Sequence, residues 1–260
     1  MKFLPAHEFN WCVARHGGHH KMQSLTCRRQ FLAMAFAQLT GRERLRDIEA
    51  WLRAVPQKLY HMGIGGPVAR TTVADANEKR DWRIYEDFAQ VLMREALSLC
   101  AGESPCVDLE QTVYAPDSTT IDLCLALFPW VQVQKAERGQ KVHTQLDLRG
   151  NIPTFIKITD GKVHDVNFLD DLTLEAGAIY VMDRGYIGFD RLYALNLANA
   201  FFVTRANLNM QWRRMRSLPA DEAAGVLSDQ VLMLTGVKTA EADPERLRRV
   251  RFSIRTRTGP

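Results

Sequence analysis

Two aspartates each end a β-favouring run, and their type and spacing make them the best candidates for chemistry in this chain. Asp117 ends the run 112–117 (TVYAPD), and Asp183 ends the run 178–183 (AIYVMD). If the two strands are neighbours in one sheet, the carboxylates face each other. Two ionised carboxylates a few ångströms apart repel unless a proton or a metal ion comes between them. Oxygen ligands suit Mg²⁺ or Mn²⁺ and not zinc, so Asp117 and Asp183 are candidate metal ligands.

A simpler explanation for Asp183 is helix capping. The turn Arg184-Gly185 follows it, and a helix-like stretch occupies 189–195. An aspartate before a helix accepts the unpaired backbone N–H groups of the first turn. For Asp183 taken alone, capping is the commoner role; the second strand of the same kind, ending at Asp117, is what favours a metal site.

The composition indicates an ordinary folded protein with an ample core. The chain has 260 residues, of which 46% are hydrophobic and 25% are charged. No run approaches the ~20 apolar residues that span a bilayer, and the N-terminus lacks a signal-peptide pattern. The five cysteines are scattered without a Cys-x-x-Cys pair, which favours reduced thiols. We therefore expect a cytoplasmic protein with no membrane partner.

The charges are arranged as an acidic centre between two basic flanks. Residues 1–100 contain 15 basic residues (lysine and arginine) and 10 acidic ones (aspartate and glutamate). Residues 101–204 contain 8 basic and 14 acidic residues, and residues 205–260 contain 11 basic and 6 acidic residues. This arrangement suits a metal-dependent enzyme acting on nucleic acid, because carboxylates hold cations and basic flanks meet phosphates.

The N-terminal stretch predicts two helices joined by a tight turn. The run 28–39 is long and apolar enough for a buried helix, and 40–43 (TGRE) matches a capping box that would open a second helix over 44–52. This pair resembles a helix-turn-helix, although an ordinary helical hairpin with a charged face explains it equally well. The predicted DNA contacts are the arginines expected to point outward, Arg42, Arg44 and Arg46.

From residue 112 the pattern changes to strands and predicts an α/β sheet of mixed direction. The expected elements are strands at 112–117, 141–148 and 152–159, a helix at 165–174, a strand at 178–183, a helix at 189–197 and a strand at 200–204. Two further strand-like runs, 230–235 and 247–254, follow this sheet.

This order of elements, with an aspartate on the first and fourth strands, resembles the RNase H-like core of DDE transposases. Asp183-Arg184-Gly185-Tyr186 is similar to the Asp-x-Gly-Tyr/Phe signature of bacterial insertion-sequence transposases, and Asp117-Ser118-Thr119 is similar to the first acid of that family. The other similar stretches are 80–85, 123–130, 143–150 and 159–165.

The resemblance implies an α/β fold with an RNase H-like, mixed five-stranded sheet. We expect a small all-helical N-terminal domain (1–77), a connecting helix and linker (78–110), the catalytic core (111–204) and the start of a β-rich insertion (205–260).

The resemblance also implies phosphoryl transfer on DNA, with strand cleavage at element ends and transfer to a target. Asp117 and Asp183 would be catalytic and would hold two Mg²⁺ (or Mn²⁺) ions. Arg184 and Tyr186 are predicted phosphate contacts. The implied partner is DNA, on which the protein could form a homo-oligomer, with no small-molecule substrate; the implied location is the bacterial cytoplasm, on the nucleoid when bound to DNA.

The sequence departs from the family at its third acid. That acid lies in Tyr-x2-Arg-x3-Glu-x6-Lys, whereas the late glutamates Glu222, Glu241 and Glu245 lack those neighbours. Glu245 is expected in a first helical turn after Asp243-Pro244. We therefore expect a truncated transposase without its third catalytic acid. The alternative function is a non-catalytic, DNA-binding remnant.

Overall fold

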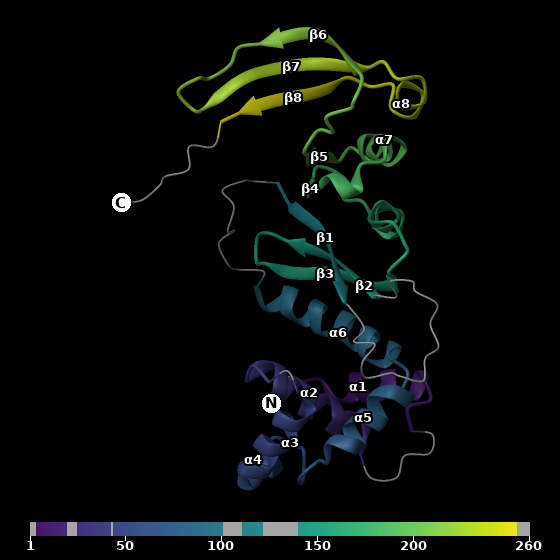
Figure 1. Cartoon of the computed structure of the whole chain (residues 1–260), viewed down its shortest axis with the longest axis vertical. Coiled ribbons are helices and arrows are strands. Elements are labelled where there is room, and N and C mark those ends of the chain that lie inside the picture. The colour runs from purple at the N-terminus through teal and green to yellow at the C-terminus, as the bar shows by residue number, and fades with distance from the viewer. Residues whose placement is uncertain (1–3, 20–24, 43, 101–110, 122–139, 254–260) are drawn as a thin grey trace. The chain divides into compact units, whose positions relative to one another are not determined.

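The chain divides into two compact units, Met1–Leu99 and Cys100–Pro260. The computed structural model describes residues 4–19, 25–42, 44–100, 111–121 and 140–253 (Figure 1). The stretch 123–130, one of those similar to the transposase family, lies outside the described residues. Each unit is built around its own core and is considered separately.

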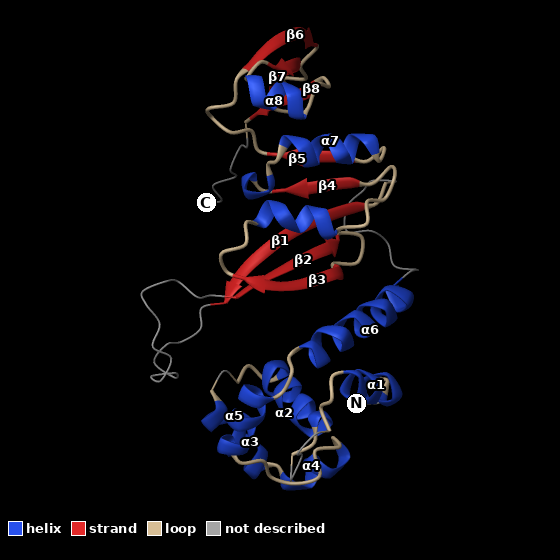
Figure 2. Ribbon diagram, turned by 90° about the vertical axis from the view of Figure 1, so that its right-hand side faces the viewer, coloured by secondary structure: helices blue, strands red, loops and turns tan. Residues whose placement is uncertain are grey.

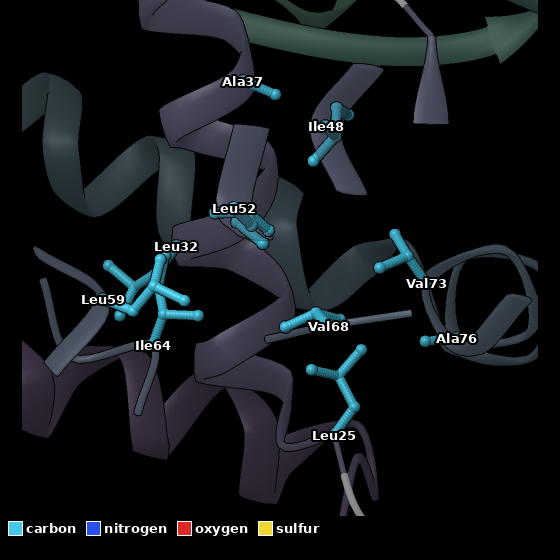
Figure 3. Packing of buried hydrophobic residues seen from close by; sticks show 11 residues of the cluster. Leu25, Leu32, Ala37, Ile48, Leu52, Leu59, Ile64, Val68, Val73 and Ala76 are labelled. Atoms are coloured by element: carbon cyan, nitrogen blue, oxygen red, sulfur yellow. The ribbon is translucent and has the colours of Figure 1, made fainter. Parts of the chain in front are cut away.

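The regular elements in the described part of the first unit are all helices, joined by loops (Figure 2). Its core collects leucine, isoleucine and valine side chains, with Leu52 at 0% exposure among Leu32, Leu59 and Ile64 (Figure 3). The helices are α1 (Ala6–Arg15), α2 (Cys27–Leu39), α3 (Leu45–Ala54), α4 (Pro56–His61), α5 (Arg70–Lys79) and α6 (Arg83–Cys100).

A second cluster joins the two ends of this unit through aromatic rings. Phe88 of α6 meets Phe9 of α1 and Phe31 of α2 edge-on, with ring centroids 4.9 and 5.2 Å apart. Edge-to-face pairs at this separation add to the stabilisation from burial. The helix expected to form part of a connecting segment, α6, therefore packs with the N-terminal helices.

The turn between α2 and α3 ends the first helix and does not cap the second. The Thr40 hydroxyl donates to the Phe36 carbonyl at 2.8 Å, and Gly41 adopts φ 65°. The Arg42 N–H then donates to the Ala37 carbonyl at 2.8 Å, which completes a Schellman motif. The predicted capping box is wrong on this point: α3 begins at Leu45, and its N-cap Arg44 makes no side-chain cap bond.

The second unit contains the expected mixed sheet, whose strand order is β3-β2-β1-β4-β5. β1 pairs antiparallel with β2, as does β2 with β3, while β1, β4 and β5 run parallel. The predicted α/β architecture is confirmed. The strands are β1 (Val113–Ile121), β2 (Gln140–Asp147), β3 (Ile152–Asp160), β4 (Ile179–Met182) and β5 (Phe201–Thr204).

One face of this sheet is packed against short helices. The α-helix α7 (Phe189–Leu197) and the 3₁₀ helix η2 (Asp165–Asp171) contribute Leu192, Leu195 and Phe168 to the core. Tyr180 is fully buried there, whereas Val181, which points to the opposite face of β4, is 38% exposed. The alternation follows from the two-residue period of a strand.

A smaller, three-stranded antiparallel sheet follows, in the order β6-β7-β8. β7 (Val226–Leu234) and β8 (Leu247–Phe252) match the strand-like runs of the sequence, whereas β6 (Trp212–Leu218) was not predicted because its arginines hide the strand pattern. The helix α8 (Val237–Ala242) ends before Asp243, so the helical position predicted for Glu245 is wrong.

No helix in the described part of the chain is both long and apolar enough to cross a membrane. Even the 18-residue helix α6 carries charges along its length, including Glu86, Asp87 and Arg94.

The burial of Leu52 predicts a large effect of truncation. Leu52→Ala should lower the free energy of unfolding of the first unit by about 2–5 kcal/mol, because it leaves a cavity in a closed core. Leu39→Ala is the matched control: Leu39 is 82% exposed, and its loss should change stability by less than ~0.5 kcal/mol. Urea unfolding followed by far-ultraviolet circular dichroism measures both, and equal losses would contradict the assigned core.

Candidate catalytic site

The pairing of β1 with β4 places the two predicted acids at equivalent positions along these neighbouring strands. Val113 pairs with Ile179 and Tyr114 with Tyr180, in parallel register. Asp117 and Asp183 each lie three residues beyond the last of these pairs. Both also line one cavity. The structure thus places the two carboxylates that the sequence singled out at the same end of the sheet and on one cavity.

Asp183 is held by two donors on one carboxylate oxygen. Its Oδ1 accepts the Arg184 backbone N–H at 2.6 Å and the Arg205 guanidinium at 2.7 Å. The hydrogen bond from Arg205, followed by that from Arg184, lowers the pKa of Asp183 below its usual value. Asp183 also caps the short 3₁₀ helix η3 (Arg184–Tyr186). It does not cap the helix over 189–197, as the sequence suggested, because that helix begins after Gly188 without a side-chain cap.

The cavity has a volume of about 1040 Å³ and combines acids with a basic wall. Asp117 and Asp183 lie on the side of the mixed sheet, and β8 with its preceding turn forms the opposite side. Its arginines are Arg205, Arg246, Arg248, Arg249 and Arg251. Such a cavity can take up an anionic ligand beside a cation held by carboxylates.

The donor chemistry fits a hard divalent cation. Asp117 and Asp183 offer exposed carboxylate oxygens, the ligands that Mg²⁺ and Mn²⁺ prefer. Glu245 lines the same cavity, yet the described residues contain no group of three or more acids, histidines or cysteines placed to hold a metal ion. The two aspartates are therefore the candidate ligands in the described part of the chain.

Tyr186 lies inside the core and not on the surface. Its side chain is 2% exposed and packs with Tyr180 and Leu192 in the cluster beneath the sheet. Burial raises its pKa to about 12, and the charges of Asp165 and Asp117 act in the same direction, against Ser118, which lowers it. This burial contradicts the predicted phosphate contact, which needs an exposed hydroxyl.

A second ion pair supports the turn that follows Asp183. Lys141 of β2 donates to Asp165 Oδ1 and to the Val163 carbonyl, each at 3.0 Å. The Asp165 carboxylate lies beside this turn, since a Cβ added to Gly185 would be 3.4 Å from Asp165 Oδ2, an ordinary van der Waals contact. Lys141 and Asp165 therefore pack next to the turn that carries Asp183.

The other predicted DNA contacts differ in exposure. Arg184, Arg44 and Arg46 are exposed, as a phosphate contact requires. Arg42 is only partly exposed, and its guanidinium lies 5.0 Å from the centre of the Trp51 ring. The expectation that Arg42 points freely outward is therefore wrong, because the guanidinium gains a cation–π contact on its own unit.

Arg205 is the site residue that the sequence reasoning missed. It follows β5 directly, as Asp183 follows β4, and the pairing of Met182 with Thr204 makes the two residues neighbours. Its place directly after a predicted strand could have identified it, because residues that follow adjacent parallel strands lie at the same edge of the sheet.

Comparison with known proteins identifies a family for most of the second unit. A family described as "Transposase DDE domain" matches residues 108–250, and a domain of unknown function, DUF4372, matches residues 1–65. A protein of Sinorhizobium fredii (strain NBRC 101917 / NGR234) named "Putative transposase y4zB" is 33% identical over 166 residues, which are 62% of this chain and 45% of that protein. The matched part thus spans less than half of this relative's length.

The buried position of Tyr186 predicts a packing role. Its hydroxyl makes no hydrogen bond of standard geometry within the described structure, although the Ser118 side chain is near enough to lower its pKa. Tyr186→Phe should therefore change the free energy of unfolding by less than ~1 kcal/mol and leave DNA affinity unchanged. Tyr186→Ala should cost about 3–5 kcal/mol, as other buried aromatic truncations do. Urea unfolding and a DNA-binding titration test the pair. A selective loss of DNA affinity in Tyr186→Phe would instead support the phosphate contact.

Proposed function

The chain belongs to the DDE transposase family, and from this premise we propose that it is a metal-dependent enzyme that cleaves DNA at the ends of an insertion sequence and transfers the strands to a target. The observation that carries the proposal is the level placement of Asp117 and Asp183 on parallel strands, facing one cavity. Because the matched part covers 45% of the named relative, the activity of the whole protein is part of the proposal.

In this proposal Asp117 and Asp183 hold Mg²⁺ or Mn²⁺, with two ions in the complete site. When bound, such ions activate the attacking oxygen and stabilise the leaving oxygen of a phosphoryl transfer. Arg184 and Arg205 keep Asp183 ionised, which a metal ligand requires. Of the arginines that line the opposite side of the cavity, Arg248 is paired with Asp229 and Arg249 lies over the Trp212 ring. Arg246 and Arg251 are therefore the ones proposed to bind the phosphates of a DNA strand.

The first unit is proposed to contact DNA through the N-terminal end of α3. Arg44 and Arg46 are exposed there, and backbone phosphates are the usual partners of such arginines. Arg42 contributes less because it stacks on Trp51. Assembly into a homo-oligomer on DNA completes the proposal and is the arrangement that a reaction at two element ends would use.

A DNA-binding role without catalysis is the second proposal. It is favoured by the finding that the described residues contain no group of three acids placed for metal binding. The two proposals differ in one outcome: only the first predicts strand cleavage, whereas both predict binding that weakens with salt as phosphate contacts release counterions.

Removing either acid should abolish cleavage. Asp117→Asn and Asp183→Asn each keep the side-chain shape and remove the charge, so Mn²⁺-dependent nicking of a plasmid carrying the DNA that flanks the gene should fall by about a thousandfold or more. Asp190→Asn is the control, because Asp190 is exposed in the first turn of α7 and does not line the cavity.

The nicking assay, together with a DNA-binding measurement, distinguishes the two proposals. If the unmodified protein nicks DNA and the Asp117→Asn and Asp183→Asn variants nick it equally well, the assignment of these two acids is refuted. DNA binding with no nicking at any Mn²⁺ concentration would favour the non-catalytic role.

A further inference from the structure

We propose that Arg205 is the resident counter-ion of Asp183 and competes with the metal ion for that carboxylate, so that Arg205 sets the metal affinity of the site. This inference rests on the proposed metal-binding role of Asp117 and Asp183. It adds a residue that neither the sequence motifs nor the family resemblance singled out.

The position of Arg205 is fixed by backbone pairing and not by a chance surface contact. All four residues of β4 pair with β5 in parallel, from Ile179 with Phe201 to Met182 with Thr204. Asp183 and Arg205 are the next residues on each chain segment. The guanidinium Nη2 lies 2.7 Å from Asp183 Oδ1, which is a short, charge-assisted hydrogen bond.

Asp183 thus lies between a second carboxylate and a guanidinium cation. The strand order β1-β4-β5 puts Asp117 on one side of it and Arg205 on the other. Within the described structure Asp117 forms no ion pair, so Arg205 neutralises only one of the two acids. A metal ion drawn to Asp117 would meet an Asp183 that already carries a cation.

Two cations cannot share Asp183 without a penalty. Oδ1 already accepts two hydrogen bonds, from Arg184 and from Arg205, which use its two lone pairs. A metal ion can bind Oδ1 only by displacing a donor, and at Oδ2 it would lie beside the Arg205 guanidinium and be repelled by its charge. The backbone N–H of Arg184 is fixed by the turn. Arg205 is the donor that can leave, because its side chain is 71% exposed and can extend into solvent.

The test measures metal affinity directly, without catalysis. Mn²⁺ is titrated into the full chain, and free Mn²⁺ is read by electron paramagnetic resonance. Arg205→Gln removes the charge with little change in polarity, and it should tighten Mn²⁺ binding roughly threefold to tenfold, a modest factor because the ion pair is exposed. Arg205→Lys keeps the charge and should bind Mn²⁺ close to the unmodified affinity.

Arg213→Gln is the matched control for net charge. Arg213 is exposed on β6 and does not line the cavity, so its loss removes one positive charge elsewhere and should leave Mn²⁺ affinity unchanged. Equal or weaker Mn²⁺ binding in Arg205→Gln overturns the inference, as does equal tightening in Arg213→Gln. The rise in melting temperature with Mn²⁺ gives a second readout, since a ligand stabilises the folded state according to its affinity.

Two further variants separate this inference from the proposed function. If Asp117→Asn and Asp183→Asn leave Mn²⁺ affinity unchanged, the metal site itself is wrong, and the role of Arg205 fails with it. If both weaken Mn²⁺ binding while Arg205→Gln has no effect, the metal site stands and only the competition by Arg205 is refuted.

Discussion

The short parallel pairing between β1 and β4 is the constraint on which the rest of the site depends. It consists of two residue pairs, Val113 with Ile179 and Tyr114 with Tyr180, and of the bond from the Ile179 N–H to the Thr112 carbonyl at 2.9 Å. A slip of one residue would turn Asp183 to the opposite face of the sheet from Asp117, because side chains alternate along a strand.

Glu175 fastens this register from the loop before β4. Its carboxylate accepts hydrogen bonds from the Thr112 hydroxyl at 3.0 Å and the Tyr114 hydroxyl at 2.6 Å, and its own N–H donates to the Tyr180 hydroxyl at 3.0 Å. The Tyr114 and Tyr180 rings also touch, with centroids 5.3 Å apart. One loop residue therefore joins both strands at their paired end, three residues before the acids. A network of this kind favours a single register because every alternative leaves polar groups unpaired.

Beyond the paired segment, charge balance shapes the site. Asp183 forms an ion pair with Arg205, and Asp165 forms one with Lys141. Arginines of the facing strand β8 line the cavity wall. Asp183 is thus kept ionised in a basic setting, which suits a site that gathers metal cations and phosphate together. The turn 183–186 is held from within the sheet's core, since the Tyr186 side chain is buried there.

The sequence by itself determined the elements and the two acids. Hydrophobic periodicity located α2, β1, β4 and α7 within a few residues, and the aspartates closing two β-favouring runs marked Asp117 and Asp183, because both signals are local. Only the tertiary structure decided which residues meet. Arg205 lies 22 positions from Asp183, and their contact exists only because β5 pairs with β4. Tyr186 and Arg42 carry polar groups that suggest contact with DNA, yet one is buried in a core and the other is stacked on Trp51. The arginines of β6 likewise hid a strand that is held by pairing with β7. In each case the deciding interaction is a contact that forms only in the folded chain, so the residue pattern of a single element could not show it.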